Sequence, residues 1–186
     1  MSRSGEARRR EKPRCRAAAF WGALFAFLFF AGSVSADTLA GRVVHVDDGD
    51  SLELRDGWGN LHRVRLRGID APERSQAYAD VSRRNLARLT RGREVTVSYD
   101  AADKYGRLLV WLYVDDGVSV NLMQVQAGLA WHYAFPGRPW TADDDLLARA
   151  QQDARAENRG LWARPRPVPP WQYRREHRDD PWHAGK

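Results

Sequence analysis

Cysteine is almost absent from this sequence of 186 residues. The single cysteine, Cys15, stands before the one long apolar run, and none follows that run. Disulfide bonds and thiolate metal sites are therefore excluded from the rest of the chain. The position of Cys15 is also unsuitable for lipid attachment at a cleavage site after the run.

A long hydrophobic run occurs only near the N-terminus. Basic residues in "RRREKPRCR" precede the apolar "AAAFWGALFAFLFFAG", and the small-residue stretch "SVSA" follows it. This order is typical of a secretory signal, and Val34 and Ala36 predict cleavage before Asp37. An uncleaved membrane anchor is the alternative, since the run approaches spanning length. Either way, we expect the folded part to be exported, as a secreted or periplasmic protein or as a membrane-anchored one.

The chain after this signal lacks an excess of one charge. Residues 37–186 hold 23 Lys and Arg against 22 Asp and Glu, so the sequence pI of about 9.9 mainly reflects residues 1–36. A nucleic-acid partner must therefore be argued from where arginines cluster. The length suits one core, which we place in residues 37–163. The Pro-, Arg- and Trp-rich tail, 164–186, is expected to be extended, either packing back through Trp162 and Trp171 or having no structural role.

Alternation of apolar and polar residues and turn signals predict a mainly β domain. The expected strands are 38–46, 51–56, 61–69, 93–99 and 107–114, and the expected helices are 76–90, 121–128 and 141–160. The last helix opens with a capping-box pattern, Thr141 and Asp144. Five strands with a helix after the third indicate an α+β, mainly β fold: an oligonucleotide-binding (OB-fold) Greek-key barrel with three helices.

The first predicted helix has two distinct faces. Its apolar stripe comprises Tyr78, Val81, Leu86 and Leu89. Its other face carries Arg83, Arg84 and Arg88.

Carboxylates gather in two short stretches, "VDDGDSL" and "IDAPE". The first presents Asp48 and Asp50 in a turn, and the second presents Asp70 and Glu73 at a strand end. Carboxylates pooled from separate strand ends suit a hard cation, Ca²⁺ or Mg²⁺, better than zinc. The alternative is purely structural, since Asp-Gly is common in turns and Asp70 with Pro72 can cap a helix. The EF-hand pattern is not met.

Arginines alternate along the third predicted strand. If Val64 and Leu66 face the core, then Arg63, Arg65 and Arg67 share the opposite face. Another arginine, Arg107, begins a later strand. Such a row is commonly only a solvated surface, but guanidinium groups are well shaped to bind phosphate through paired hydrogen bonds.

The stretches "VDDGDSL", "RLRGIDAPE" and "DKYGRLLVW", in this order and spacing, resemble the staphylococcal nuclease (thermonuclease) family. The resemblance runs from about residue 38 to 162 and includes "GLAWHY" and "ENRGLW". It implies a five-stranded OB-fold barrel with three helices and Ca²⁺-dependent hydrolysis of DNA and RNA phosphodiesters that leaves 3′-phosphate ends.

The resemblance also implies roles for eight residues. Asp50, Asp70 and the backbone carbonyl of Ala71 would bind Ca²⁺, and Glu73 would be the general base or position the water. Arg65 and Arg107 would hold the phosphate and stabilise the transition state. Lys104 and Tyr105 would contact a terminal phosphate. Ser51 and Ala71 depart from the best-known family pattern, in which threonine and a hydroxyl residue are usual.

Two function classes are consistent with these residues. The first is an exported nuclease acting on DNA and RNA, with single strands preferred, as a monomer without a protein partner and with membrane contact only if the signal is uncleaved. The alternative is a non-catalytic OB-fold module that binds nucleic acid. Carboxylates facing an anionic ligand require a cation between them, which favours the nuclease. Tyr133 and Trp131 are candidates for base stacking, with packing as the alternative.

Overall fold

The computed structural model describes residues 36–115 and 117–177. The chain divides into two units, Met1–Ser33 and Val34–Lys186. The first unit, which holds most of the predicted signal, lies outside the described residues, all of which belong to the second unit. Among the described residues, no helix has the length and apolar character needed to span a membrane.

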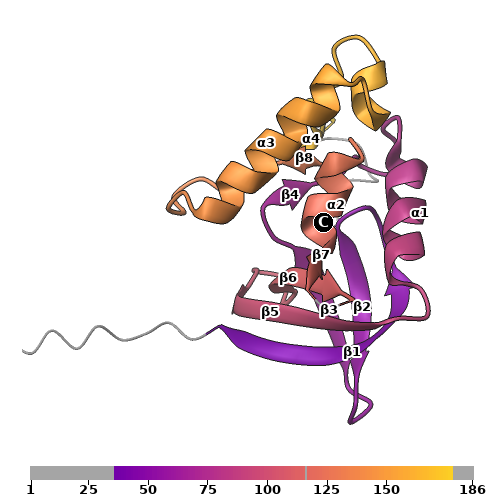
Figure 1. The fold of residues 1–186 in the computed structure, drawn as a ribbon, viewed down its shortest axis with the longest axis vertical. Coiled ribbons are helices and arrows are strands. Elements are labelled where there is room, and N and C mark those ends of the chain that lie inside the picture. Colours follow the sequence, from indigo (N-terminus) through magenta and orange to yellow (C-terminus); the bar gives the residue numbers. More distant parts are fainter. Residues whose placement is uncertain (1–35, 116, 178–186) are drawn as a thin grey trace, which may run out of the picture. The chain divides into compact units, whose positions relative to one another are not determined.

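A closed five-stranded barrel forms the centre of this unit (Figure 1). Its strands are β1 (Asp37–Val46), β2 (Ser51–Asp56), β3 (Leu61–Leu66), β5 (Glu94–Ala102) and β6 (Leu108–Val114). Antiparallel pairing runs in the order β3-β2-β1-β5-β6, and a parallel pairing of β3 with β6 closes the barrel. The short β7 (Val118–Ser119) pairs antiparallel with the end of β6. The predicted OB-fold barrel is confirmed.

Alternation along the strands produces the barrel core. The buried residues of β2, β3 and β6 include Leu52, Leu54, Val64, Leu66, Val110 and Leu112. Each of them stands two positions from the next on its strand, as the two-residue period of a strand requires. Their intervening neighbours are left to face outward, and some of these carry the polar groups of the site.

Three helices occupy the predicted regions, with shifted ends. They are α1 (Ala79–Thr90), α2 (Val120–Gln126) and α3 (Ala142–Ala156). Helix α1 begins three residues later than predicted, because Tyr78 adopts a left-handed conformation with φ of 70°. Val81 is 40% exposed, so its predicted place in the apolar stripe was wrong. The capping box at Thr141 and Asp144 is confirmed.

The predicted third strand is interrupted before its end. Gly68 has φ of 74°, so β3 ends at Leu66 and a separate strand, β4 (Ile69–Asp70), follows. Strand β4 pairs with β8 (Trp131–His132), which sets Asp70 opposite Trp131. The chain therefore leaves the barrel immediately before it delivers the Asp70 carboxylate.

The C-terminal segment differs most from expectation. The prediction of an extended tail is wrong for residues 170–176, which form a fourth helix, α4 (Pro170–Glu176), after the short 3₁₀ helix η1 (Gly160–Ala163). Proline at the first helical position is favourable, because its missing N–H has no partner there in any case. Trp171 of α4 packs edge-on against Trp131, so the segment does return to the domain, as one of the alternatives held.

Candidate active site

The turn between β1 and β2 presents Asp50 to the end of β3. The backbone N–H of Asp50 donates to the Asp48 carboxylate, and the N–H of Leu66 donates to the Asp50 carbonyl over 2.8 Å. Gly49 lies against helix α1, where an added Cβ would stand only 1.9 Å from Oγ of Ser82. This position therefore requires glycine, and the close packing fixes the direction in which Asp50 points.

Arg65 joins two buried carboxylates, one from the turn between β1 and β2 and one from β4. Its Nη1 donates to Oδ1 of Asp50 over 2.6 Å, and its Nη2 donates to Oδ1 of Asp70 over 2.7 Å. Antiparallel pairing sets Arg65 directly opposite Ser51, next to Asp50. Asp50 and Asp70 are each only 1% exposed. Two carboxylates this deeply buried need compensating positive charge.

A tight turn after Asp70 brings Glu73 to the same place. The N–H of Ala71 donates to Oδ2 of Asp50 over 2.7 Å, which ties the turn to the first carboxylate. The N–H of Glu73 donates to the side chain of Gln76. Glu73 is only 7% exposed. The predicted set of Asp50, Arg65, Asp70, Ala71 and Glu73 is thus one contiguous group.

Burial controls the ionisation of this group. It raises the pKa of Asp50 to about 7, against the lowering effect of Arg65, and the neighbouring Asp48 and Asp70 carboxylates raise that pKa further. For Arg65, burial alone lowers the pKa, but Asp50 and Asp70 outweigh it and raise the pKa above its usual value. Arg65 is therefore a permanent positive charge within the site.

Sequence reasoning missed one residue that contacts this group, Arg174 of α4. Its Nη1 donates to Oε1 of Glu73 over 2.7 Å, and its Nη2 donates to Oδ2 of Asp70 over 2.9 Å. The only sequence signal was an arginine pair in a charged tail, which has no preferred partner without the fold. A guanidinium thus lies between the predicted metal ligand and the predicted base.

The remaining predicted residues form a separate cluster before β6. The Lys104 ammonium lies 4.9 Å and the Arg107 guanidinium 5.6 Å from the centre of the Tyr105 ring. Nε of Arg107 donates to Oδ2 of Asp103 over 2.7 Å, which orients the guanidinium. The parallel register pairs Arg65 with Leu109, so alternation directs Arg107 toward the same face as Arg65.

Arg63, Arg67 and Trp131, which the sequence also singled out, have other surroundings than the carboxylate group. Arg67 pairs with Asp100, and Arg63 is exposed. Trp131 is buried against Trp162, with ring centres 4.3 Å apart, so packing describes it better than base stacking.

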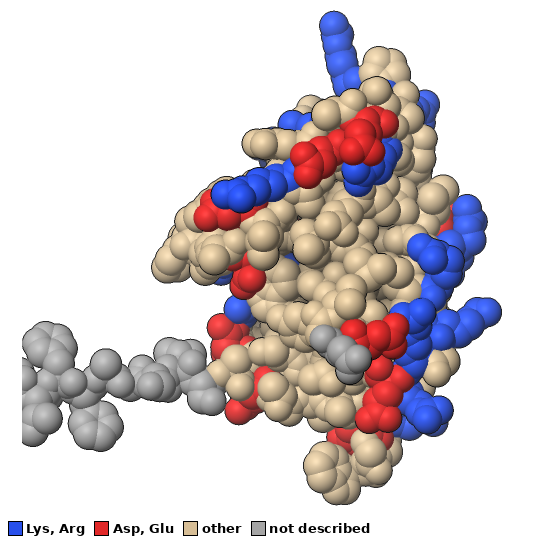
Figure 2. All heavy atoms as spheres, viewed as in Figure 1, with Lys and Arg blue, Asp and Glu red and all other residues tan. Residues whose placement is uncertain are grey.

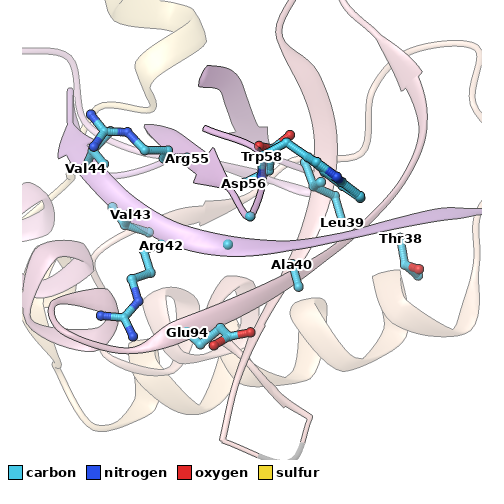
Figure 3. Close-up of a pocket in the computed structure, with 12 residues that line it drawn as sticks. Thr38, Leu39, Ala40, Arg42, Val43, Val44, Arg55, Asp56, Trp58 and Glu94 are labelled. Atoms are coloured by element: carbon cyan, nitrogen blue, oxygen red, sulfur yellow. Dashed lines mark hydrogen bonds between the residues drawn. The ribbon is translucent and has the colours of Figure 1, made fainter. Parts of the chain in front are cut away.

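An open cavity of about 630 Å³ lies elsewhere, along β1 and the hairpin that joins β2 to β3 (Figure 3). Its lining includes the exposed Trp58 and two arginines, Arg42 and Arg55. None of the predicted site residues lines it. The carboxylate group around Arg65 therefore remains the candidate active site.

Comparison with known proteins agrees with this geometry. The family model described as "Staphylococcal nuclease homologue" matches residues 63–164, which include Arg65, Asp70, Glu73 and Arg107. The chain belongs to the staphylococcal nuclease family. Its homologues are nucleases, so this protein is a nuclease and therefore a hydrolase. The family resemblance noted in its sequence is confirmed.

Curated relatives of the nuclease extend the match beyond the family region. An "Uncharacterized endonuclease" of Escherichia coli O157:H7 is 42% identical over 151 residues, covering 81% of this chain and 94% of the relative. A "Micrococcal nuclease" of Shigella flexneri is 36% identical over 143 residues, covering 73% and 80%. "Protein ParB" of Escherichia coli is 40% identical over 146 residues, covering 74% and 80%. The roles of individual residues stay predictions.

Proposed function

We propose that this nuclease is an exported, Ca²⁺-dependent enzyme that hydrolyses DNA and RNA phosphodiester bonds to leave 3′-phosphate ends. The observation that carries the proposal is the sharing of Arg65 by two buried carboxylates, Asp50 and Asp70, with Glu73 on the adjoining turn. Both the family resemblance and the predicted signal in residues 1–36 support it.

The residues present suit a hard divalent cation. The proposed ligands are the carboxylates of Asp50 and Asp70 and the carbonyl of Ala71, so every protein donor is oxygen, as Ca²⁺ prefers. Among residues 36–115 and 117–177, no three side chains of His, Cys, Asp or Glu are arranged to hold a metal by themselves. The ligand set therefore relies on a main-chain carbonyl and water. When bound, the cation would neutralise charge on the phosphate and polarise its oxygens.

In the reaction we propose, Glu73 accepts the proton of the attacking water. The water oxygen forms a bond to phosphorus while the bond to the 5′ oxygen breaks. The departing 5′ oxygen takes up a proton from solvent, which leaves a 3′-phosphate and a 5′-hydroxyl. Arg65 and Arg107 provide fixed positive charge where negative charge develops on the phosphoryl oxygens. The fixed orientation of Arg107 by Asp103 supports this role, because a preorganised group needs no rearrangement during reaction.

Substrate contacts are proposed for two surfaces. We propose that Lys104 and Tyr105, which lie beside Arg107, hold a terminal phosphate. Basic side chains also line the edge of the molecule on which α1 lies (Figure 2), including the exposed Arg84 and Arg88. Such a row attracts a phosphate backbone without reading its sequence. We propose that single strands of DNA and RNA are preferred and that the nuclease acts as a monomer.

The decisive test is hydrolysis of single-stranded DNA by the purified full-length protein in excess Ca²⁺ and again with a chelator. We expect cleavage only with Ca²⁺, and products that a polymerase extends only after phosphatase treatment. Chelator-resistant cleavage would refute calcium dependence. A folded protein that retains the strand without cleaving it would instead be a non-catalytic binding module.

A further inference from the structure

Arg174 lies where positive charge is needed beside the proposed cation ligands. In addition to its bonds to Glu73 and to Oδ2 of Asp70, its Nη1 lies 3.3 Å from Oδ1 of Asp70. Both oxygens of Asp70 are therefore engaged, since Oδ1 also accepts from Arg65. A carboxylate held in this way can offer little to a cation until one guanidinium leaves.

A count of formal charges also indicates that Arg174 and a cation compete for these carboxylates. Asp50, Asp70 and Glu73 carry three negative charges when ionised, and Arg65 supplies one positive charge. The remaining charge of −2 equals that neutralised by one divalent cation. Arg174 neutralises half of it, so this arginine and a divalent cation are alternative partners for the same carboxylates.

The arginine that can leave is Arg174 and not Arg65. Arg65 lies on β3, which is paired on both sides with β2 and β6, whereas the side chain of Arg174 is 37% exposed on a helix of seven residues. Pro170 is the single buried residue of that helix. Trp171 packs on Trp131 and Tyr133, Gln76 donates to the Val168 carbonyl, and Tyr173 donates to Ser75. A segment with so little burial opens at low free-energy cost.

Helix α4 also covers an aromatic side chain beside the site. Trp171 lies against Tyr133, with ring centres 5.1 Å apart and planes inclined by 36°. Tyr133 follows β8, which pairs with the strand that carries Asp70. The same short helix therefore contacts the proposed metal ligand, the proposed base and a neighbouring aromatic face.

We propose that α4 is an autoinhibitory strap: Arg174 occupies the cation position between Asp70 and Glu73, and the nuclease stays latent until divalent cation displaces it. The inference rests on the proposed function, because it takes Asp70 to be a cation ligand and Glu73 to be the base. Linkage then requires that the strap weaken cation binding and that the cation, in turn, loosen the strap.

The first experiment measures Ca²⁺ affinity by calorimetry on the full-length protein without nucleic acid. Arg174→Ala is compared with Arg175→Ala, a matched control because Arg175 is the exposed neighbour on the same helix. We expect Arg174→Ala to bind Ca²⁺ at least tenfold more tightly, and Arg175→Ala to stay within twofold of the parent. Equal affinities in all three proteins would overturn the strap.

The second experiment needs no variant. Amide hydrogen exchange of residues 170–176 is followed in the parent protein with and without Ca²⁺. We expect exchange in α4 to accelerate at least tenfold when Ca²⁺ is bound, while that of the barrel strands stays unchanged or slows. Equal or slower exchange in α4 with bound Ca²⁺ would mean that Arg174 and the cation bind together, which contradicts the proposal.

Activity separates this inference from the proposed function. If the strap is correct, the Ca²⁺ concentration for half-maximal hydrolysis falls at least tenfold in Arg174→Ala, and the rate at saturating Ca²⁺ is retained. A lower saturating rate with unchanged Ca²⁺ affinity would make Arg174 a substrate-binding residue and overturn only the strap. Absence of both Ca²⁺ binding and hydrolysis in every variant would overturn the proposed function and the strap together.

Discussion

Nη1 of Arg174 lies 2.7 Å from Oε1 of Glu73, although 101 positions separate the two residues. The contact joins a helix beyond residue 164, where the family match ends, to a turn within the matched region. Of the proposed catalytic and ligand residues, Arg65, Asp70, Ala71, Glu73 and Arg107 lie within the matched region, and Asp50 precedes it. The arginine that restrains them comes from a segment outside that match.

Removal of the Glu73 carboxylate should slow hydrolysis by orders of magnitude without unfolding the protein. General-base catalysis contributes a factor of about 10² to 10⁴, so Glu73→Gln should lose at least about 100-fold in kcat. Glu53→Gln, at a half-buried position of β2 away from the site, is the matched control and should keep the parent rate. Near-parent turnover by a folded Glu73→Gln protein would remove this residue from the mechanism.

Arg107 should not be replaceable by lysine. Asp103 orients its guanidinium, and an ammonium group offers a point charge in place of a planar pair of donors. We expect Arg107→Lys to lower kcat/KM by more than about tenfold, a factor that equals about 1.4 kcal/mol. Arg63→Lys on the exposed face of β3 is the control. Activity of Arg107→Lys within threefold of that control would show that no paired hydrogen bonds to phosphate are made.

Two glycines, one on either side of β2, should differ in how much replacement by alanine changes stability. A Cβ at Gly49 would meet Ser82 Oγ at 1.9 Å, whereas a Cβ at Gly57 would have no atom within 4 Å. Overpacking costs about 1–3 kcal/mol, so Gly49→Ala should lower the free energy of unfolding by that amount in a urea titration. Gly57→Ala should change it by less than about 0.5 kcal/mol. Equal stability of the two variants would contradict the tight packing of the Asp50 turn.

Asp144 should make the free energy of unfolding depend on pH below about pH 4. Burial alone raises the pKa of Asp144, but hydrogen bonds from Thr141, Arg138 and His132 outweigh it and lower that pKa to about 2. Because the unfolded value is near 3.8, this contribution is complete above about pH 4 and is lost as the pH falls through 2.

Asp144→Asn should therefore be less stable at pH 7, by about 1–3 kcal/mol, and should lose less stability between pH 4 and pH 2 than the parent. Chemical denaturation at several pH values measures both effects. Asp145→Asn is the control, since Asp145 is exposed and accepts one hydrogen bond from Trp140. The same pH profile in Asp144→Asn and the parent would contradict this assignment.

Local patterns predicted most of the barrel because they act over a few residues. Alternation identified the five strands, and the Thr141–Asp144 spacing identified the start of α3. The missed start of α1 and the missed end of β3 depend on single backbone conformations, at Tyr78 and Gly68. Helix α4 was missed because its proline-rich approach resembles an extended tail, and Trp171 finds its partners only in the folded domain.

The sequence by itself determined the barrel, the positions of Asp50, Asp70 and Glu73 at turns and strand ends, and the arginine on the third strand. Only the tertiary structure decided which guanidinium meets which carboxylate: Arg65 joins Asp50 to Asp70, Arg107 turns to Asp103, and Arg174 reaches Asp70 and Glu73. Strand periodicity is fixed by neighbours along the chain, whereas ion pairs form through space between whichever charges the packing brings together.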